Sequence, residues 1–99
     1  IPADTQLLPN YPNPFNPETW IPFDLAEDAS VEISIYGGQG ELVRTLMLGH
    51  VDAGIYRHQD KAAYWDGRNA NGELIASGVY FYRIQAGDYN QIRKMVILK

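Results

Sequence analysis

A run of six strand-forming residues constrains the fold of this chain more than any other feature. Residues 79–84 read VYFYRI, and the turn-forming pairs Asn71-Gly72 and Ala86-Gly87 bound the region. β-Branched and aromatic residues in a short run between turn residues are typical of a half-buried or central strand. The run closes a longer stretch, residues 65–87, that begins with an aromatic residue and a tight polar loop. We therefore expect the other strands to assemble around residues 79–84.

Alternating apolar and polar residues predict further strands before this run. In residues 20–25 and 31–36 every second residue is apolar, so each strand has one inward face. The inward residues are Ile21, Phe23 and Leu25 in the first strand and Val31, Ile33 and Ile35 in the second. Pro22 lacks a backbone donor, which predicts that the first strand lies at an edge or belongs to a pair of strands with a free side.

Turn signals recur roughly every 8–12 residues along the chain. They separate further expected strands at residues 42–48, 55–65 (with a break near 60–61) and 91–99, with a short apolar rung at 74–76. The turns fall at residues 27–30, 37–40, 49–54 and 87–90. This pattern predicts an all-β fold, an immunoglobulin-like or fibronectin-type antiparallel β-sandwich of about seven strands.

The first 17 residues differ in composition from the rest. Five of the six prolines lie there, and proline forbids a regular helix and favours extended backbone. We expect residues 1–17 to form an extended, proline-rich linker leading into a sandwich domain at residues 18–99. The apolar residues of the segment favour a strap docked on the body over a free linker. The start at Ile1 suggests a piece of a longer chain.

Charge and cysteine content exclude several classes of protein. The net charge is −4 with only 8 Lys and Arg, and no basic cluster is present, so we expect no nucleic-acid partner. The absence of cysteine excludes disulfides and thiolate zinc sites. The apolar run at residues 95–98 is far too short to span a membrane, and we expect no membrane insertion.

The sequence offers no arrangement typical of catalysis. No G-x-S-x-G motif surrounds a serine, and Ser77 reads as a turn residue. His50 and His58 show no partner spacing, so we expect a solvated or packing role for both. Acidic pairs such as Asp52 with Asp60 read as turn clusters, because 99 residues leave little room for a cleft. We expect a protein that is not an enzyme and holds no cofactor.

The polar loop after Trp65 has an alternative interpretation as a calcium site. Asp66, Asn69 and Asn71 supply oxygen ligands, but Gly67 interrupts the strict calcium-loop pattern. A turn built on Asn71-Gly72, with Asp66 accepting hydrogen bonds from loop amides, explains the same residues without a metal.

Two further alternatives use residues along the strands. Lys61 or Lys94 beside a buried Asn could form an internal isopeptide bond, although no spacing demands it. The aromatic residues could form a platform that stacks on polysaccharide, or they could fill the core. We expect Tyr80 and Tyr82 in the core, while the alternation leaves the faces of Trp20 and Tyr89 open.

Three stretches in this order resemble a known family. The motifs are YPNPFNPETWIPFDL (residues 11–25), WDGRNANGELIASGVYFYRI (65–84) and RKMVILK (93–99). They are similar to the C-terminal sorting domain (type A) of type IX secretion cargo, which is related to the immunoglobulin-like domain of the flagellar hook-capping protein. The resemblance covers almost the whole chain.

The resemblance implies a function as well as a fold. It implies a non-catalytic C-terminal module of an exported bacterial protein, located at the outer-membrane surface or outside the cell. The secretion and attachment machinery would recognise it, and an N-terminal cargo domain would precede it. The family features map onto Gly78, Tyr80, Gly87, Lys94 and Lys99, in the last hairpin. The alternative is an accessory structural or carbohydrate-binding module of an extracellular enzyme.

Overall fold

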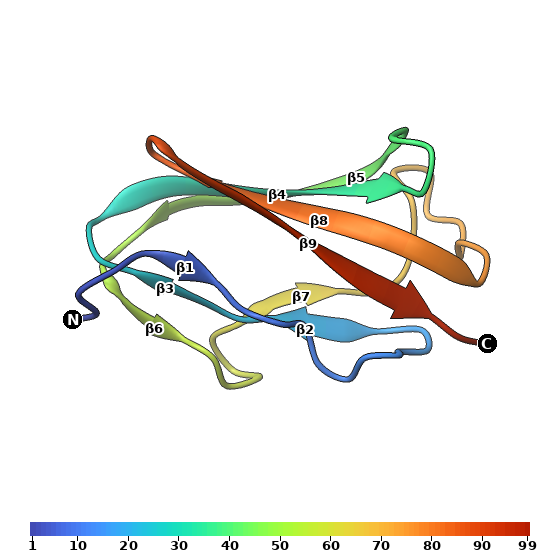
Figure 1. Cartoon of the computed structure of the whole chain (residues 1–99), viewed down its shortest axis with the longest axis horizontal. Helices are drawn as coiled ribbons and strands as arrows, with labels where there is room; N and C mark the ends of the chain where they lie inside the picture. The colour runs from blue at the N-terminus through green and yellow to red at the C-terminus, as the bar shows by residue number, and fades with distance from the viewer.

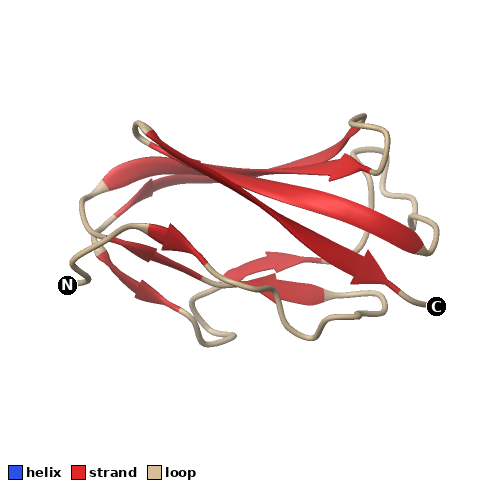
Figure 2. Ribbon diagram, in the orientation of Figure 1, coloured by secondary structure: helices blue, strands red, loops and turns tan.

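The computed structural model describes residues 1–99 and contains nine strands and no helix (Figure 2). The strands are β1 (Gln6–Leu7), β2 (Thr19–Ile21), β3 (Phe23–Leu25), β4 (Ala29–Gly37), β5 (Leu42–Val51), β6 (Gly54–Tyr56), β7 (Ala63–Trp65), β8 (Gly78–Ala86) and β9 (Tyr89–Ile97). The structure offers no helical segment with the length and hydrophobicity that a membrane crossing requires.

The strands form two layers that enclose one core (Figure 1). One layer is a four-stranded antiparallel sheet in the order β5-β4-β8-β9. The other layer consists of a three-stranded sheet, β1-β3-β6, and a two-stranded sheet, β2-β7. This arrangement confirms the all-β, immunoglobulin-like sandwich that the sequence predicts.

The four-stranded sheet follows the alternation of the sequence. Val31, Ile33 and Ile35 of β4 are buried, while the residues between them face outward. In β8 the fully buried residues are Tyr82 and Ile84. β8 pairs with β4 on one side and β9 on the other, so the expected central strand is confirmed.

Pro22 divides the strand that the sequence places at residues 20–25. β2 pairs with β7, whereas β3 pairs with both β1 and β6. The prediction of an edge strand is therefore wrong for β3, which is the middle strand of its sheet. Since Pro22 has no N–H to donate, it serves as the break between two sheets. Ile21, Phe23 and Leu25 all face the core, as expected.

Three other boundaries also differ from the prediction. Residues 55–65 form two short strands, β6 and β7, that belong to different sheets and are joined by a turn. β5 continues to Val51, so the turn expected at residues 49–54 shrinks to Asp52 and Ala53. Residues 74–76 form no strand, although Leu74 makes an isolated bridge with Arg68.

The proline-rich N-terminal segment is docked on the sandwich. Leu7 and Phe15 are buried in the core, and β1 pairs with β3. Phe15 also forms a parallel bridge with Ile97 at the edge of β9. We call residues 6–17 the strap, because they run across both layers from β3 to β9. The ring centroid of Phe15 lies 5.7 Å from that of Trp65, the largest fully buried side chain.

Buried polar groups fix the strap where it has no regular strand partners. The backbone N–H of Asn10 donates to the Tyr82 hydroxyl (2.9 Å), which donates to the Leu8 carbonyl (2.8 Å). The amide of Asn10 donates to Thr19 Oγ1 at 3.0 Å. Burial raises the pKa of Tyr82 to about 12, because the phenolate would lose its hydration there.

Candidate functional site

The last hairpin, β8–β9, carries all the residues that the family resemblance marks as recognition features. Its strands pair without a register shift from Gly78↔Ile97 to Ala86↔Tyr89. Gly87 lies in the connecting turn with φ +58°, a left-handed conformation that glycine adopts without strain. A hairpin turn is present as expected, but it is shorter than residues 87–90: it contains only Gly87 and Asp88, because Tyr89 and Asn90 already pair with β8.

The outer edge of β9 is covered at its C-terminal end. The Phe15 N–H donates to the Val96 carbonyl (3.0 Å), and the Leu98 N–H donates to the Phe15 carbonyl (3.1 Å). The Val96 N–H donates to Asn13 Oδ1. The backbone groups of Val96 therefore point away from β8, toward the strap.

The same parity leaves a short edge near the middle of β9 without backbone partners, which we call the free edge, although the Leu7 carbonyl of the strap accepts a hydrogen bond from Arg93 Nε beside it (2.8 Å). Residues of an antiparallel strand alternate in the side to which their N–H and C=O groups point. Ile92 and Lys94 share the parity of Val96, so their backbone groups point outward, and the strap makes no backbone hydrogen bond with them. Strand addition is thus possible only along this part of β9.

The five predicted recognition residues do not form one patch. Gly78 and Lys99 lie at the end of the hairpin near the C-terminus, and Gly87 lies at the opposite end (Figure 1). Tyr80 is half-buried against the core, and its hydroxyl donates to the Ala76 carbonyl at 2.8 Å. Its pKa is raised, first by burial and then by the nearby Glu41 carboxylate.

The two lysines of this set are exposed. Lys94 pairs with Phe81 across β8 and β9, on the outer face of the four-stranded sheet. Lys99 follows β9, and its backbone N–H donates to Ser77 Oγ at 3.0 Å. Both ammonium groups are therefore free to contact a partner that approaches the free edge of β9 or the end of the chain.

The polar loop at residues 66–73 uses its oxygens internally. Asp66 Oδ1 accepts hydrogen bonds from the Arg44 side chain (3.2 Å) and from the Arg68 N–H (3.0 Å). Asn69 Oδ1 accepts the N–H groups of Asn71 (2.9 Å) and Glu73 (3.0 Å). These contacts hold the loop as an Asx-type turn, the metal-free alternative for this segment.

The aromatic side chains divide into a buried set and a second set in which Tyr64 is exposed and Tyr11 and Trp20 are half-buried. Tyr82 is fully buried, as expected. Tyr11, Trp20 and Tyr64 instead form a row on the outer face of β2 and β7, with ring centroids 6.3 Å and 5.6 Å apart. The row arises because Tyr11 bridges Trp20 and Trp20 pairs with Tyr64 across adjacent strands.

Two expectations about individual side chains change. Lys61 and Lys94 are both exposed, and the buried Asn10 bonds to Pro12 and Thr19, so neither lysine is in the buried setting that an isopeptide bond would use. His50 is not without a partner: its Nε2 lies 3.5 Å from Asp52 Oδ1. The His-x-Asp spacing is the sequence signal for this contact: His50 lies at the end of β5 and Asp52 directly follows the strand, and residues two apart in extended backbone share one face.

The sequence model of the FlgD Ig-like domain matches residues 15–90. The chain belongs to the FlgD Ig-like domain family. This fold is a non-catalytic one, and the match supports the hook-capping side of the sequence resemblance.

A solved structure supports the same fold. The chain is similar to the crystal structure of dimeric latent PorU from Porphyromonas gingivalis, with a TM-score of 0.69 and 21% sequence identity. The likeness covers 99% of this chain and 10% of that one, so the chain spans a tenth of the structure that it resembles. No curated protein matches the sequence.

Proposed function

We propose that this FlgD Ig-like domain is a non-catalytic module of an exported bacterial protein, recognised by the type IX secretion and cell-surface attachment machinery. The observation that carries the proposal is the presence of two features on one hairpin. The sequence motifs that resemble sorting domains, residues 65–84 and 93–99, end in β8 and β9. This hairpin also has a free backbone edge and exposed lysines.

The proposed mode of recognition is contact with a folded domain. The partner would pair with the backbone of Ile92 and Lys94 and bind the ammonium groups of Lys94 and Lys99. Gly87 and Tyr80 would act indirectly, since Gly87 forms the turn and Tyr80 packs against the core. The domain itself would follow an N-terminal cargo and remain with it to the outer-membrane surface or the medium.

The test is a secretion assay in a host that has the type IX machinery. A reporter with an ordinary export signal is fused to residues 1–99, and reporter at the surface or in the medium is measured. Deleting β9 would be uninformative, because Met95 and Ile97 belong to the core. The informative variant is Lys94→Glu with Lys99→Glu, which reverses two exposed charges.

The matched control is Lys61→Glu, an exposed lysine in the turn before β7. We expect the double variant to reduce export at least several-fold while the control exports normally and both fold. Normal export of the double variant would refute recognition through these lysines. Periplasmic retention of every fusion, wild type included, would refute the sorting function itself.

The aromatic row supports a second candidate, polysaccharide binding. Sugar rings stack on aromatic faces that solvent reaches, and Tyr11, Trp20 and Tyr64 lie next to one another on three chain segments. Tyr64 is exposed, Tyr11 and Trp20 are half-buried, and the rings of Trp20 and Tyr64 are tilted by 54°. A pull-down with insoluble polysaccharides tests this function. Trp20→Ala should abolish retention, whereas Tyr36→Ala, on the outer face of the other layer, should not. Equal retention of both variants, or none for wild type, would refute it.

A further inference from the structure

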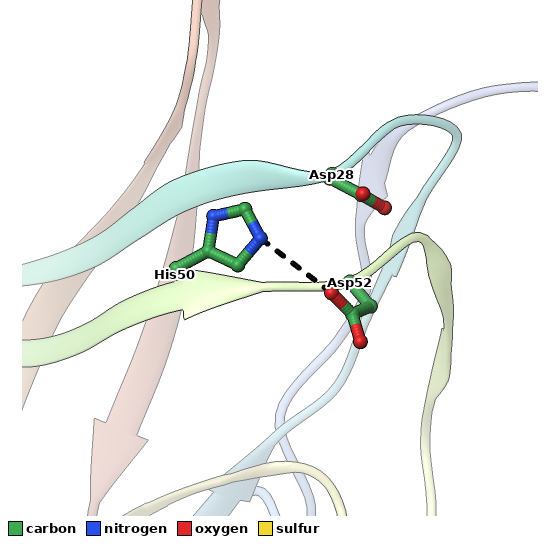
Figure 3. A group of neighbouring side chains, drawn as sticks. All are labelled: Asp28, His50 and Asp52. Carbon is green, nitrogen blue, oxygen red and sulfur yellow. Dashed lines mark ion pairs between the residues drawn. The ribbon is translucent and has the colours of Figure 1, made fainter.

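Three side chains, two from separate turns and one from β5, meet at the end of the sandwich opposite the C-terminus. Asp28 directly precedes β4, His50 lies in β5, and Asp52 directly follows β5 (Figure 3). The pairing of β4 with β5 brings them together, because Ser30 is opposite His50 and Ala29 is opposite Val51. All three side chains are exposed, and none belongs to the β8–β9 hairpin.

The donor atoms of these side chains converge. One nitrogen of His50 and one carboxylate oxygen each of Asp28 and Asp52 lie within 4.8 Å of one another. Bonds from zinc to imidazole and carboxylate are about 2.0–2.2 Å long. Two ligands of one ion therefore stand roughly 3–4 Å apart, and exposed side chains can close the remaining gap by small rotations.

A backbone contact orients one of the ligands. Asp28 Oδ1 accepts a hydrogen bond from the Ala53 N–H at 2.7 Å. This bond ties the turn before β4 to the turn after β5 and leaves the second carboxylate oxygen of Asp28 available. Hydrogen bonds of this kind commonly hold metal ligands in place.

The charge around the three side chains also favours a cation. Asp28, but neither His50 nor Asp52, lines a hollow of about 360 Å³ together with Glu27 and Asp88, and no Lys or Arg lines this hollow. The arginine ion pairs of the protein lie elsewhere: Arg57 pairs with Asp24, and Arg44 pairs with Asp66. No Lys or Arg therefore pairs with the carboxylates at this end, and the basic group beside Asp52 is the imidazole of His50.

We propose that Asp28, His50 and Asp52 bind a divalent transition-metal ion of the zinc type. An imidazole with two carboxylates suits zinc and its neighbours in the first transition series, whereas calcium and magnesium prefer ligand sets of oxygen alone. Water would complete the coordination. The bound ion would clip the start of β4 to the end of β5, and it would stabilise the folded domain by mass action.

The test uses the untagged domain titrated with Zn²⁺ by isothermal calorimetry, with chemical shifts of the histidine ring protons as a second readout. We expect one ion per chain, shifts of the His50 ring and not of the His58 ring, and a higher Tm with zinc. His50→Ala and Asp52→Asn should each weaken binding at least tenfold. The side chains of His50 and Asp52 are both exposed, so both variants should keep the wild-type fold.

The matched control is His58→Ala, which removes the only other imidazole and should leave zinc binding unchanged. Absence of zinc binding by the wild-type domain would overturn the proposal. Equal binding by wild type and His50→Ala would overturn it too, because the ion would then sit elsewhere. A zinc-dependent change in the chemical shifts of the His58 ring protons alone would also overturn the proposal.

Discussion

The two layers of the sandwich contribute comparably to one core but are built in different ways. β4, β5, β8 and β9 have 9–10 residues each, whereas the strands of the other layer have two or three. The short-strand layer nevertheless supplies fully buried side chains, such as Phe23, Leu25 and Trp65. A long strand is therefore not required for a residue to be part of this core, since Phe23, Leu25 and Trp65 all lie in strands of three residues.

The short-strand layer replaces ladder hydrogen bonds with side-chain contacts. In β3, the buried Asp24 accepts two hydrogen bonds from Arg57, at 3.0 Å and 2.6 Å, and one from Gln6 at 2.9 Å. The Arg57 guanidinium, helped by Gln6 and opposed by burial, holds the pKa of Asp24 below its usual value. These contacts join β1, β3 and the segment after β6, which share few backbone pairs.

The largest effect is expected when the short-strand layer loses its central side chain. Trp65→Ala removes a fully buried indole that packs on Phe15 and should cost about 3–5 kcal/mol of unfolding free energy. Since small domains are stable by about 5–15 kcal/mol, the variant should be partly unfolded at physiological temperature. Urea denaturation followed by circular dichroism measures the change.

The neighbouring residue provides the control for Trp65. Tyr64→Ala changes an aromatic residue of the same strand that is 48% exposed and bonds to Glu18. It should cost no more than about 1 kcal/mol, as expected for a surface position. Equal losses for the two variants would mean that β7 contributes through strand pairing and not through the buried face.

The sequence predicts the long-strand layer well for a physical reason. Nine residues of β4 display several periods of alternation, and the tight turn at Gly87 fixes the β8–β9 pairing. A strand of three residues displays no measurable period. For this reason the alternation predicts one strand where the structure has β2 and β3, and one strand where it has β6 and β7. The sheet to which each of these short strands belongs depends on contacts between residues distant in sequence.

The candidate sites also differ in whether their residues are contiguous in the sequence or come together only in the fold. The recognition hairpin is contiguous in sequence, so its residues could be proposed from motifs alone. The aromatic row needs Tyr11, Trp20 and Tyr64 to pair across three segments. The proximity of Asp28 to His50 depends on the register of β4 and β5, which shifts between Val31 and Glu32. The alternation of apolar and polar residues in a strand does not show where its pairing with the next strand shifts by one residue.

Alanine substitution at two glycines, one in each layer's loops, should change the free energy of unfolding by a smaller amount than Trp65→Ala. A Cβ at Gly67 would lie 2.1 Å from the Pro17 carbonyl oxygen, and its φ is +77°. Gly67→Ala should cost about 2–4 kcal/mol, combining backbone strain with a clash against the strap. Gly87→Ala has a similar strain at φ +58° but no atom within 4 Å, so it should cost about 1–2 kcal/mol.

Thermal unfolding of both variants tests whether the close approach of the strap is what distinguishes them. If Gly87→Ala is destabilised as much as Gly67→Ala, the backbone conformation alone accounts for both losses. The strap would then be able to move away from residue 67 at little cost, and the short-strand layer would be more adaptable than its contacts imply.

The smallest effect concerns the hydroxyl group that joins the two layers. Tyr82→Phe keeps the buried ring of β8 but removes the partner of the Asn10 N–H and the Leu8 carbonyl, which should cost about 1–2 kcal/mol at neutral pH. Tyr36→Phe, on the outer face of the same sheet, is the control and should change little.

The stabilisation by the Tyr82 hydroxyl should also depend on pH with a definite sign. Its pKa is about 12 in the folded state, against about 10 in an unfolded chain. A raised pKa of this kind means that the contribution is complete below about pH 10 and is lost as the pH rises toward 12. The stability gap between wild type and Tyr82→Phe, measured by urea unfolding at pH 7 and about pH 11, should therefore narrow at the higher pH. A gap that stays constant would mean that the hydroxyl is hydrated in the folded state, and the strap would then be held by Phe15 and Leu7 without this polar link.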